Sequence, residues 1–136
     1  MPKVVKKSEK PQVGEKAPDF NSLDQDGKKI SLKEFKGKTV VLYFYPKDNT
    51  PGCTKESCSL RDRYSTFKKK GVVVLGVSKD SQKSHQGFIE KYDLPFTLIS
   101  DTDKEVQCAY GVWQEKNMYG KKVMGTVRTT FIIGPD

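Results

Sequence analysis

Hydrophobic residues along this chain fall into short runs that are separated by amphipathic segments. The first run, residues 39–45 (TVVLYFY), is rich in β-branched and aromatic residues. Such a composition is typical of a strand that is buried on both faces of a central sheet. Three later runs, residues 72–77, 96–99 and 127–133, are predicted to be strands of the same sheet.

The segment after the first strand has the periodicity of an α-helix. The side chains at the offsets of one helix face are Cys53, Ser57, Leu60, Tyr64 and Phe67. We expect this helix to end at Gly71, because glycine readily adopts the left-handed conformation that closes a helix. Residues 81–92 are predicted to form a second helix, with Phe88, Ile89 and Tyr92 facing inward.

A short helix before the first strand is predicted from its cap. Ser31 and Glu34 have the spacing of a capping box, and Gly37 marks the end of this helix. The last predicted helix covers residues 103–110. Strands and helices that alternate in this way predict an α/β fold with a mixed central sheet flanked by helices on both faces.

Length and composition fit one domain that follows a short tail. A chain of 136 residues can bury a single core without disulfides or metals. Residues 1–12 are basic and without periodicity, so we expect a flexible tail, with the domain at residues 13–136. No apolar stretch approaches the ~18–20 residues that span a bilayer. The N-terminus also lacks the apolar segment of an export signal, so we expect a cytoplasmic protein with no membrane partner.

The net charge of +8 is the one feature that favours a nucleic-acid partner. The lysines, however, are spread along the whole chain, and three arginines accompany them: Arg61, Arg63 and Arg128. Nucleic-acid-binding surfaces usually place arginine and aromatic residues together on one face. We therefore interpret the charge as a solvated lysine surface and expect no nucleic-acid partner.

Three cysteines carry the candidate chemistry, because an odd number without an export signal argues against a structural disulfide framework. Cys53 is predicted to open a helix directly after a buried strand and a loop rich in Pro and Gly. Free N–H groups and the helix dipole favour an anion there, and cysteines in such positions have pKa values lowered from ~8.5 to ~3.5–7.5. Cys53 is therefore a candidate nucleophile, and an inert buried cysteine is the alternative.

The residues around Cys53 resemble those of a known family. The run Pro-x-x-x-Thr-Pro-Gly-Cys at residues 46–53 matches the active-site signature of peroxiredoxins. With Cys58 following, the chain resembles the peroxiredoxin Q, or bacterioferritin comigratory protein, subfamily. Shorter matches occur along residues 11–136, at 17–20, 36–38, 100–101 and 128–131.

This resemblance implies a thioredoxin-like fold and a thiol-dependent peroxidase that uses no cofactor and no metal. Cys53 would attack the O–O bond of hydrogen peroxide or an organic hydroperoxide and become a sulfenic acid. The Thr50 hydroxyl would orient thiolate and peroxide, and the charge of Arg128 would favour the thiolate and the developing oxygen anion. Pro46 and Gly52 would line the substrate pocket, with Pro46 shielding it from water.

The resemblance also implies that Cys58 resolves the sulfenic acid as a disulfide, which a thioredoxin-type dithiol then reduces. Two residues five apart on a regular helix have Cα atoms about 8–9 Å apart, whereas a disulfide requires ~7 Å or less. The helix must therefore unwind around residues 53–58. Some relatives carry the resolving cysteine on the helix that matches residues 81–92, where this chain has none. Cys108 is interpreted as a packing residue.

Two other functions are compatible with the same residues. A metal-binding module could use Cys53, Cys58 and the single histidine, His85, although we expect His85 to be exposed among polar neighbours. A zinc ribbon would need a second ligand pair. A dithiol oxidoreductase of the thioredoxin type prefers Cys-x-x-Cys, and four residues separate the cysteines here.

One departure concerns the end of the chain. Relatives in the family continue past Gly134, Pro135 and Asp136 with another strand and a closing helix, which we expect to be missing here. One edge of the sheet would then be open. We expect a monomer, with a dimer as the alternative.

Overall fold

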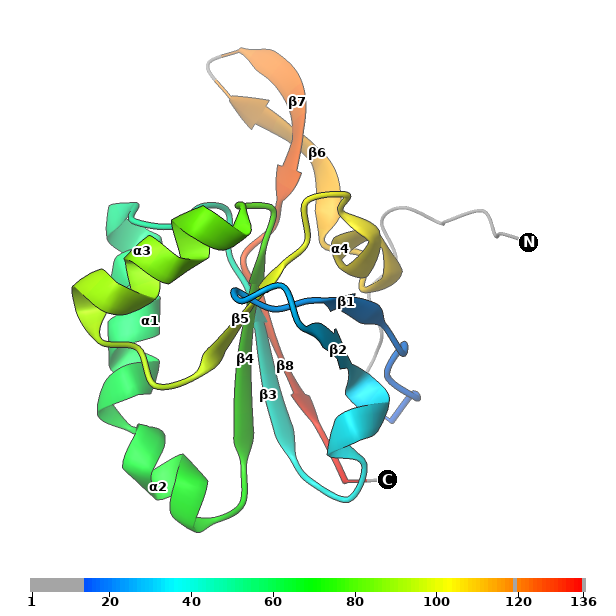
Figure 1. Ribbon diagram of the computed structural model, residues 1–136. Coiled ribbons are helices and arrows are strands. Elements are labelled where there is room, and N and C mark those ends of the chain that lie inside the picture. Colours follow the sequence, from blue (N-terminus) through cyan, green and yellow to red (C-terminus); the bar gives the residue numbers. More distant parts are fainter. Residues whose placement is uncertain (1–13, 119, 136) are drawn as a thin grey trace.

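A mixed sheet of four strands forms the centre of the molecule (Figure 1). Its strand order is β5 (Thr97–Ser100), β4 (Val73–Ser78), β3 (Val40–Phe44) and β8 (Thr129–Ile133). Strands β3, β4 and β5 are parallel, and β8 is antiparallel to β3. The structure is a computed structural model that describes residues 14–118 and 120–135, so the predicted tail lies outside the described residues.

Strand β3 is fully buried because it lies inside the sheet and is covered on both faces. Val40, Leu42 and Phe44 point into one hydrophobic cluster, and Val41 and Tyr43 point into the other. This alternation follows from the two-residue period of a strand. The prediction of a doubly buried strand, and with it the α/β fold class, is confirmed.

Three helices cover one face of the sheet, shown on the left in Figure 1. They are α1 (Pro51–Asp62), α2 (Tyr64–Lys69) and α3 (Gln82–Tyr92). The single helix predicted up to Gly71 is in fact two helices, because the Arg63 N–H bonds to the carbonyl three residues back, at Leu60, at 3.2 Å. Gly71 ends the second one with φ +71°, as predicted.

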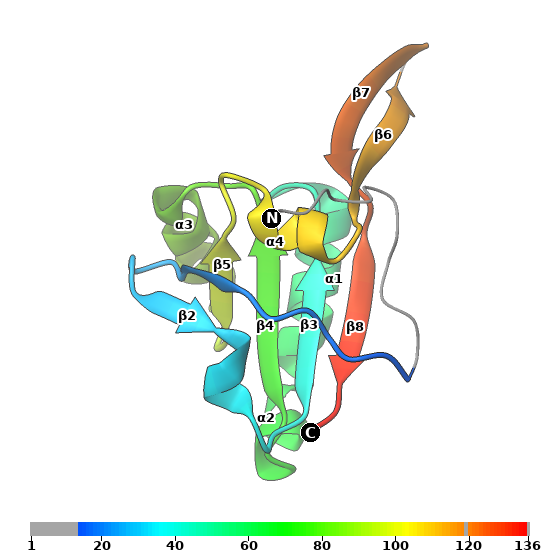
Figure 2. The ribbon, with the colours of Figure 1, turned by 90° about the vertical axis from the view of Figure 1, so that its right-hand side faces the viewer.

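The opposite face is covered by a hairpin and two short helices (Figure 2). The hairpin pairs β1 (Asn21–Leu23) with β2 (Lys29–Ser31), and the helices are η1 (Leu32–Phe35) and α4 (Glu105–Ala109). Helix η1 begins at the predicted capping box, where the Ser31 N–H donates to the Glu34 carboxylate at 2.8 Å. The described residues include no helix with the length and apolar character needed to cross a membrane.

A second hairpin extends beyond the end of the sheet (Figure 1). It pairs β6 (Trp113–Met118) with β7 (Lys121–Thr126). The sequence did not predict it, because these strands are largely polar and have no apolar face for the core. The hairpin leads directly into residues 127 and 128, which precede β8 at the same end of the sheet as the start of α1.

Asp101 follows β5 and caps helix α4 from a fully buried position. Its carboxylate accepts hydrogen bonds from the backbone N–H groups of Val106 at 3.1 Å and Gln107 at 2.9 Å. Burial raises the pKa of Asp101 from 3.8 to about 6, although these two donors oppose the shift. The folded state therefore holds this proton more tightly than the unfolded state does.

We predict that Asp101 destabilises the fold as the pH rises. A raised pKa means that the folded state binds more protons between pH 4 and 6, so the free energy of unfolding falls across that window by at most about 3 kcal/mol. Chemical denaturation of the wild type and Asp101→Asn at several pH values measures this effect. The free energy of unfolding of the wild type minus that of Asp101→Asn should fall from about pH 4 to about pH 6 and then stay constant. A difference that is flat across this window contradicts the assignment.

Candidate active site

The six residues 45–50 connect the end of β3 to the start of α1, at the end of the sheet where parallel strands usually form sites. The Tyr45 N–H still bonds to the Val77 carbonyl at 3.1 Å, so the strand extends to the start of the loop. Asn49 has φ 64°, and Thr50 is extended at φ −85° and ψ 154°. Pro51 explains the helix start, because proline requires an extended residue before it and suits the first helical position.

Cys53 lies in the first turn of α1 and has no solvent-exposed surface. The first helical hydrogen bond in this turn runs from the Thr54 N–H to the Thr50 carbonyl at 2.8 Å. The cysteine packs at the edge of the cluster formed by the sheet and helices α1 to α3. The side chain thus sits where backbone N–H groups and the helix dipole favour an anion.

Arg128 contacts the Cys53 sulfur directly. Its Nη2 lies 3.1 Å from Cys53 Sγ, although 75 positions separate the two residues. Partial burial lowers the pKa of Arg128, but hydrogen bonds to Cys53 and Glu56 outweigh it and leave this pKa above its ordinary value. The guanidinium is therefore a permanent positive charge beside the sulfur. The structure brings these two predicted residues together.

Glu56 belongs to the same site and was missed in the sequence. Its Oε1 accepts from Arg128 Nη1 at 2.9 Å, and its Oε2 accepts from the Thr130 hydroxyl at 3.4 Å. The carboxylate thus holds one side of the guanidinium while Nη2 faces the sulfur. The signal was present: Glu56 lies three residues after Cys53, so both occupy one helix face.

Gly52 makes room for this arrangement. A Cβ atom built at Gly52 would lie 3.1 Å from Arg128 Nη2, which is closer than most side-chain contacts. Glycine at this position therefore has a steric reason. Any larger residue at this position would push the guanidinium away from Cys53.

Thr50 and Pro46 lie in the same loop but are not hydrogen-bonded to Cys53 among the described contacts. The Thr50 hydroxyl donates to the Lys47 carbonyl at 3.0 Å. Pro46 is half-buried, and its carbonyl accepts from Lys79 Nζ at 3.4 Å. Both residues are thus placed near the helix start, with the Thr50 oxygen free to accept a further hydrogen bond.

Cys58 is half-buried on the same helix as Cys53, and both are free thiols. The residue before it, Ser57, is fully buried and shares a hydrogen bond of 3.0 Å with the Tyr43 hydroxyl on β3. Burial raises the pKa of Tyr43, so this phenol keeps its proton. Two cysteines five positions apart on an intact helix are too distant for a disulfide.

Cys108 lies on α4, on the other side of the sheet from Cys53 (Figure 1). Its side chain is partly buried. Burial raises the pKa of the Cys108 thiol, and the nearby carboxylates of Asp101 and Asp103 add to this rise. A thiol with a raised pKa is a poor nucleophile, which agrees with the expected packing role.

His85 was expected to be exposed, and this expectation is wrong: its side chain is fully buried. His85, Phe88 and Tyr92 lie on one face of α3, and this inward face outweighs the polar neighbours in sequence. The metal-binding hypothesis joined His85 to Cys53 and Cys58. In the described part of the chain, no metal-sized cluster contains either of these cysteines.

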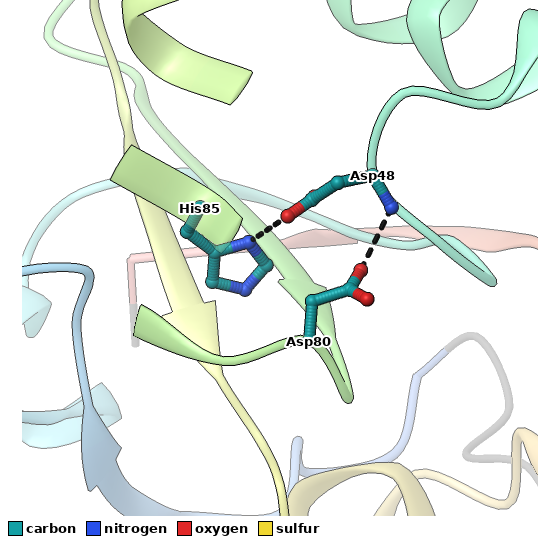
Figure 3. A group of neighbouring side chains, drawn as sticks. All are labelled: Asp48, Asp80 and His85. Atoms are coloured by element: carbon teal, nitrogen blue, oxygen red, sulfur yellow. Dashed lines mark hydrogen bonds and ion pairs between the residues drawn. The ribbon is translucent and has the colours of Figure 1, made fainter. Parts of the chain in front are cut away.

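His85 instead lies beside two carboxylates (Figure 3). One ligand atom from each of Asp48, Asp80 and His85 lies within 4.8 Å of the others. Both ring nitrogens of His85 are hydrogen-bonded, to the Asp48 carboxylate at 2.8 Å and to the Ile99 carbonyl at 3.0 Å. A metal ligand needs a nitrogen lone pair that is free, so this cluster is a hydrogen-bond network.

Comparison with known proteins identifies the family of the chain. The model of the AhpC/TSA family matches residues 13–136. The bcp peroxiredoxin of Coxiella burnetii is 58% identical over 122 residues, which cover 90% of this chain and 81% of that protein. Peroxiredoxin Q of Xanthomonas campestris has a TM-score of 0.81 at 43% identity, over 86% of this chain and 74% of that one.

A further similar structure is described together with an enzymatic activity. It belongs to the bacterioferritin comigratory protein of Xanthomonas campestris and is described for alkyl peroxide reduction. Its TM-score is 0.81 at 42% identity, over 85% of this chain and 74% of that one. The thioredoxin-like fold implied by the resemblance is therefore confirmed. The chain belongs to the AhpC/TSA family and is a peroxiredoxin of the Q or Bcp type, a thiol peroxidase.

Proposed function

We propose that Cys53 is the peroxidatic cysteine of this peroxidase and acts on hydrogen peroxide and organic hydroperoxides. The observation that carries the proposal is the 3.1 Å contact between Cys53 Sγ and Arg128 Nη2 at the start of α1. A cation and a helix N-terminus both stabilise a thiolate relative to a thiol. Because the thiolate is the nucleophile, this pairing supports attack by Cys53 on a peroxide.

In the first step the thiolate attacks the terminal oxygen of the hydroperoxide. The S–O bond forms as the O–O bond breaks, so the sulfur is oxidised to a sulfenic acid and the peroxide is reduced. The leaving oxygen takes up a proton and departs as water or an alcohol. Arg128 stabilises the negative charge that develops on the two oxygens.

Thr50 would orient the incoming hydroperoxide. While its hydroxyl donates to the Lys47 carbonyl, its oxygen can accept the hydrogen bond of the peroxide O–H. Pro46, half-buried at the start of the loop, would shield the pocket from water. Gly52 keeps the space that the guanidinium occupies.

Cys58 would resolve the sulfenic acid, forming a disulfide and releasing water. The first turns of α1 must unwind for this step, which breaks the hydrogen bond between Ser57 and Tyr43. It also moves Glu56 away from Arg128. A thioredoxin-type dithiol would then reduce the disulfide. Such a reductant fits the cytoplasmic location and the monomer expected from the sequence.

Single-turnover kinetics should distinguish the roles of the three cysteines. Cys53→Ser should abolish peroxide consumption, because no thiolate remains to attack. Cys58→Ser should still consume one equivalent of peroxide per chain but should not turn over with thioredoxin. Cys108→Ser is the control and should behave as the wild type. Turnover by Cys58→Ser at the wild-type rate with thioredoxin would remove Cys58 from the mechanism.

Arg128 and Glu56 should affect the peroxide step to different extents. Arg128→Ala should lower the second-order rate constant with hydrogen peroxide by about 10²–10³-fold, as expected for the loss of a charge-stabilising donor. Glu56→Gln keeps one acceptor but loses the charge, so a smaller loss is expected. Stopped-flow measurement with excess peroxide gives both constants. A larger loss in Glu56→Gln than in Arg128→Ala would contradict this order.

Unwinding of α1 should be visible in hydrogen exchange. Amides of residues 53–58 should exchange slowly in the reduced protein and much faster in the disulfide form, because the helix cannot persist when the two cysteines are joined. Amides of α3 serve as the internal control and should not change. Equally slow exchange of residues 53–58 in both forms would exclude a disulfide between Cys53 and Cys58.

A further inference from the structure

Asp48 anchors the loop that precedes Cys53. It is 5% exposed, and its carboxylate accepts hydrogen bonds from the Tyr45 hydroxyl at 2.6 Å and the Ser84 hydroxyl at 2.8 Å. The same carboxylate lies 2.8 Å from His85 Nδ1, and the Asp48 N–H donates to Asp80 at 2.7 Å. Asp48 is thus bound to the residue that follows β3, to α3 and to the segment after β4. Figure 3 shows its contacts with His85 and Asp80.

Each ring nitrogen of His85 faces an oxygen atom. A backbone carbonyl can only accept, so Nε2, 3.0 Å from the Ile99 oxygen, carries a hydrogen. An ionised carboxylate also only accepts, so beside an ionised Asp48, which already accepts from Tyr45 and Ser84, Nδ1 carries a hydrogen as well. An imidazole that donates from both nitrogens is an imidazolium. With Asp48 ionised, the 2.8 Å contact between His85 and Asp48 is a buried ion pair.

The neighbouring groups are consistent with this charge state. Burial raises the pKa of Tyr45, so its phenol keeps the proton that it donates to Asp48. Asp80 accepts from the Ser78 hydroxyl at 2.7 Å in addition to the Asp48 N–H. A buried charge is stable only when it is paired and its hydrogen-bonding positions are filled, and the imidazolium meets both conditions.

Asp48, the anchor of the loop, is separated from Cys53 by a very short segment of chain. Thr50 follows Asp48 by two residues, and its hydroxyl bonds to the Lys47 carbonyl at 3.0 Å on the other side of Asp48. Thr50 is also the N-cap of α1, whose first turn contains Cys53. Any displacement of Asp48 therefore moves the helix start relative to Arg128.

We propose that His85 is a positioning residue for the peroxide step: as an imidazolium it holds Asp48, and thereby fixes the loop that sets Thr50 and Cys53 beside Arg128. The proposal rests on the proposed role of Cys53. It predicts a selective effect. Unwinding of α1 for disulfide formation involves residues after the anchor, so the second step does not require it.

The protonation of His85 can be tested without any activity measurement. Because the chain has a single histidine, its ring signals in a long-range ¹H–¹⁵N spectrum need no assignment. The reduced protein at pH 7 should show two ring N–H protons and the nitrogen shifts of an imidazolium. The spectrum of a neutral ring, with one unprotonated nitrogen, would overturn the proposal.

The positioning role requires kinetics on His85→Gln and Asp48→Asn. Each variant should oxidise at Cys53 about 10- to 100-fold more slowly, as expected for a misplaced reacting group. Formation of the disulfide with Cys58, followed in quenched samples, should change by less than about 2-fold, because unwinding does not involve the anchor. The double variant should lose little more than either single one, since both break the same contact.

Val106→Ala is the matched control, because it weakens the buried cluster on the opposite face of the sheet. It should leave the oxidation rate close to that of the wild type. Equal slowing of both steps, or an unchanged oxidation rate in folded His85→Gln, would overturn the positioning role. If His85→Gln does not fold, Asp48→Asn decides the question. A wild type that consumes no peroxide would refute the proposed function, while the ring spectrum would still report on His85.

Discussion

The contact between the Cys53 sulfur and the Arg128 guanidinium determines what the rest of this fold must provide. The two residues are 75 positions apart, so neither helix α1 nor the loop before it can make the contact alone. Strand β8 supplies it by pairing antiparallel with β3, with Thr129 opposite Phe44. Arg128 therefore lies at the end of the sheet from which the chain enters α1. Gly52, which has no side chain, allows the guanidinium to approach closely.

The proposed mechanism places two opposing requirements on helix α1. An intact first turn places Cys53 against Arg128 and lets Glu56 hold the guanidinium. The same intact turn keeps Cys58 beyond the reach of a disulfide. The buried contacts of this segment are few: Cys53 and Ser57 are its buried residues. A segment with few buried contacts can open locally at a low cost in free energy, so the two requirements can be met in succession.

Sequence patterns predicted the strands and helices that have a strong local run of apolar residues. They failed for features that depend on contacts with residues distant in the sequence. The central strands and the helix face through Cys53 follow from strong runs of apolar residues. The β6–β7 hairpin is polar and leaves no such signal. His85 looks exposed among its neighbours, yet its partners Asp48 and Ile99 are 37 and 14 positions away. Glu56 stands at a helical spacing from Cys53, but its importance appears only once β8 brings Arg128 beside it.

The polar contacts around Cys53 differ in strength on its two sides. The loop around Asp48 is the fixed side, and the start of helix α1 is the yielding side. On the fixed side, Asp48 has partners from three separate elements, and in the proposed ion pair loss of His85 would leave a buried charge uncompensated, which is costly. On the yielding side, the helix is held by the neutral bond between Tyr43 and Ser57 and by a partly exposed ion pair. Neutral hydrogen bonds and exposed ion pairs contribute about 1 kcal/mol each. In the proposed mechanism, this difference in strength would direct unwinding into α1 and keep the loop in place.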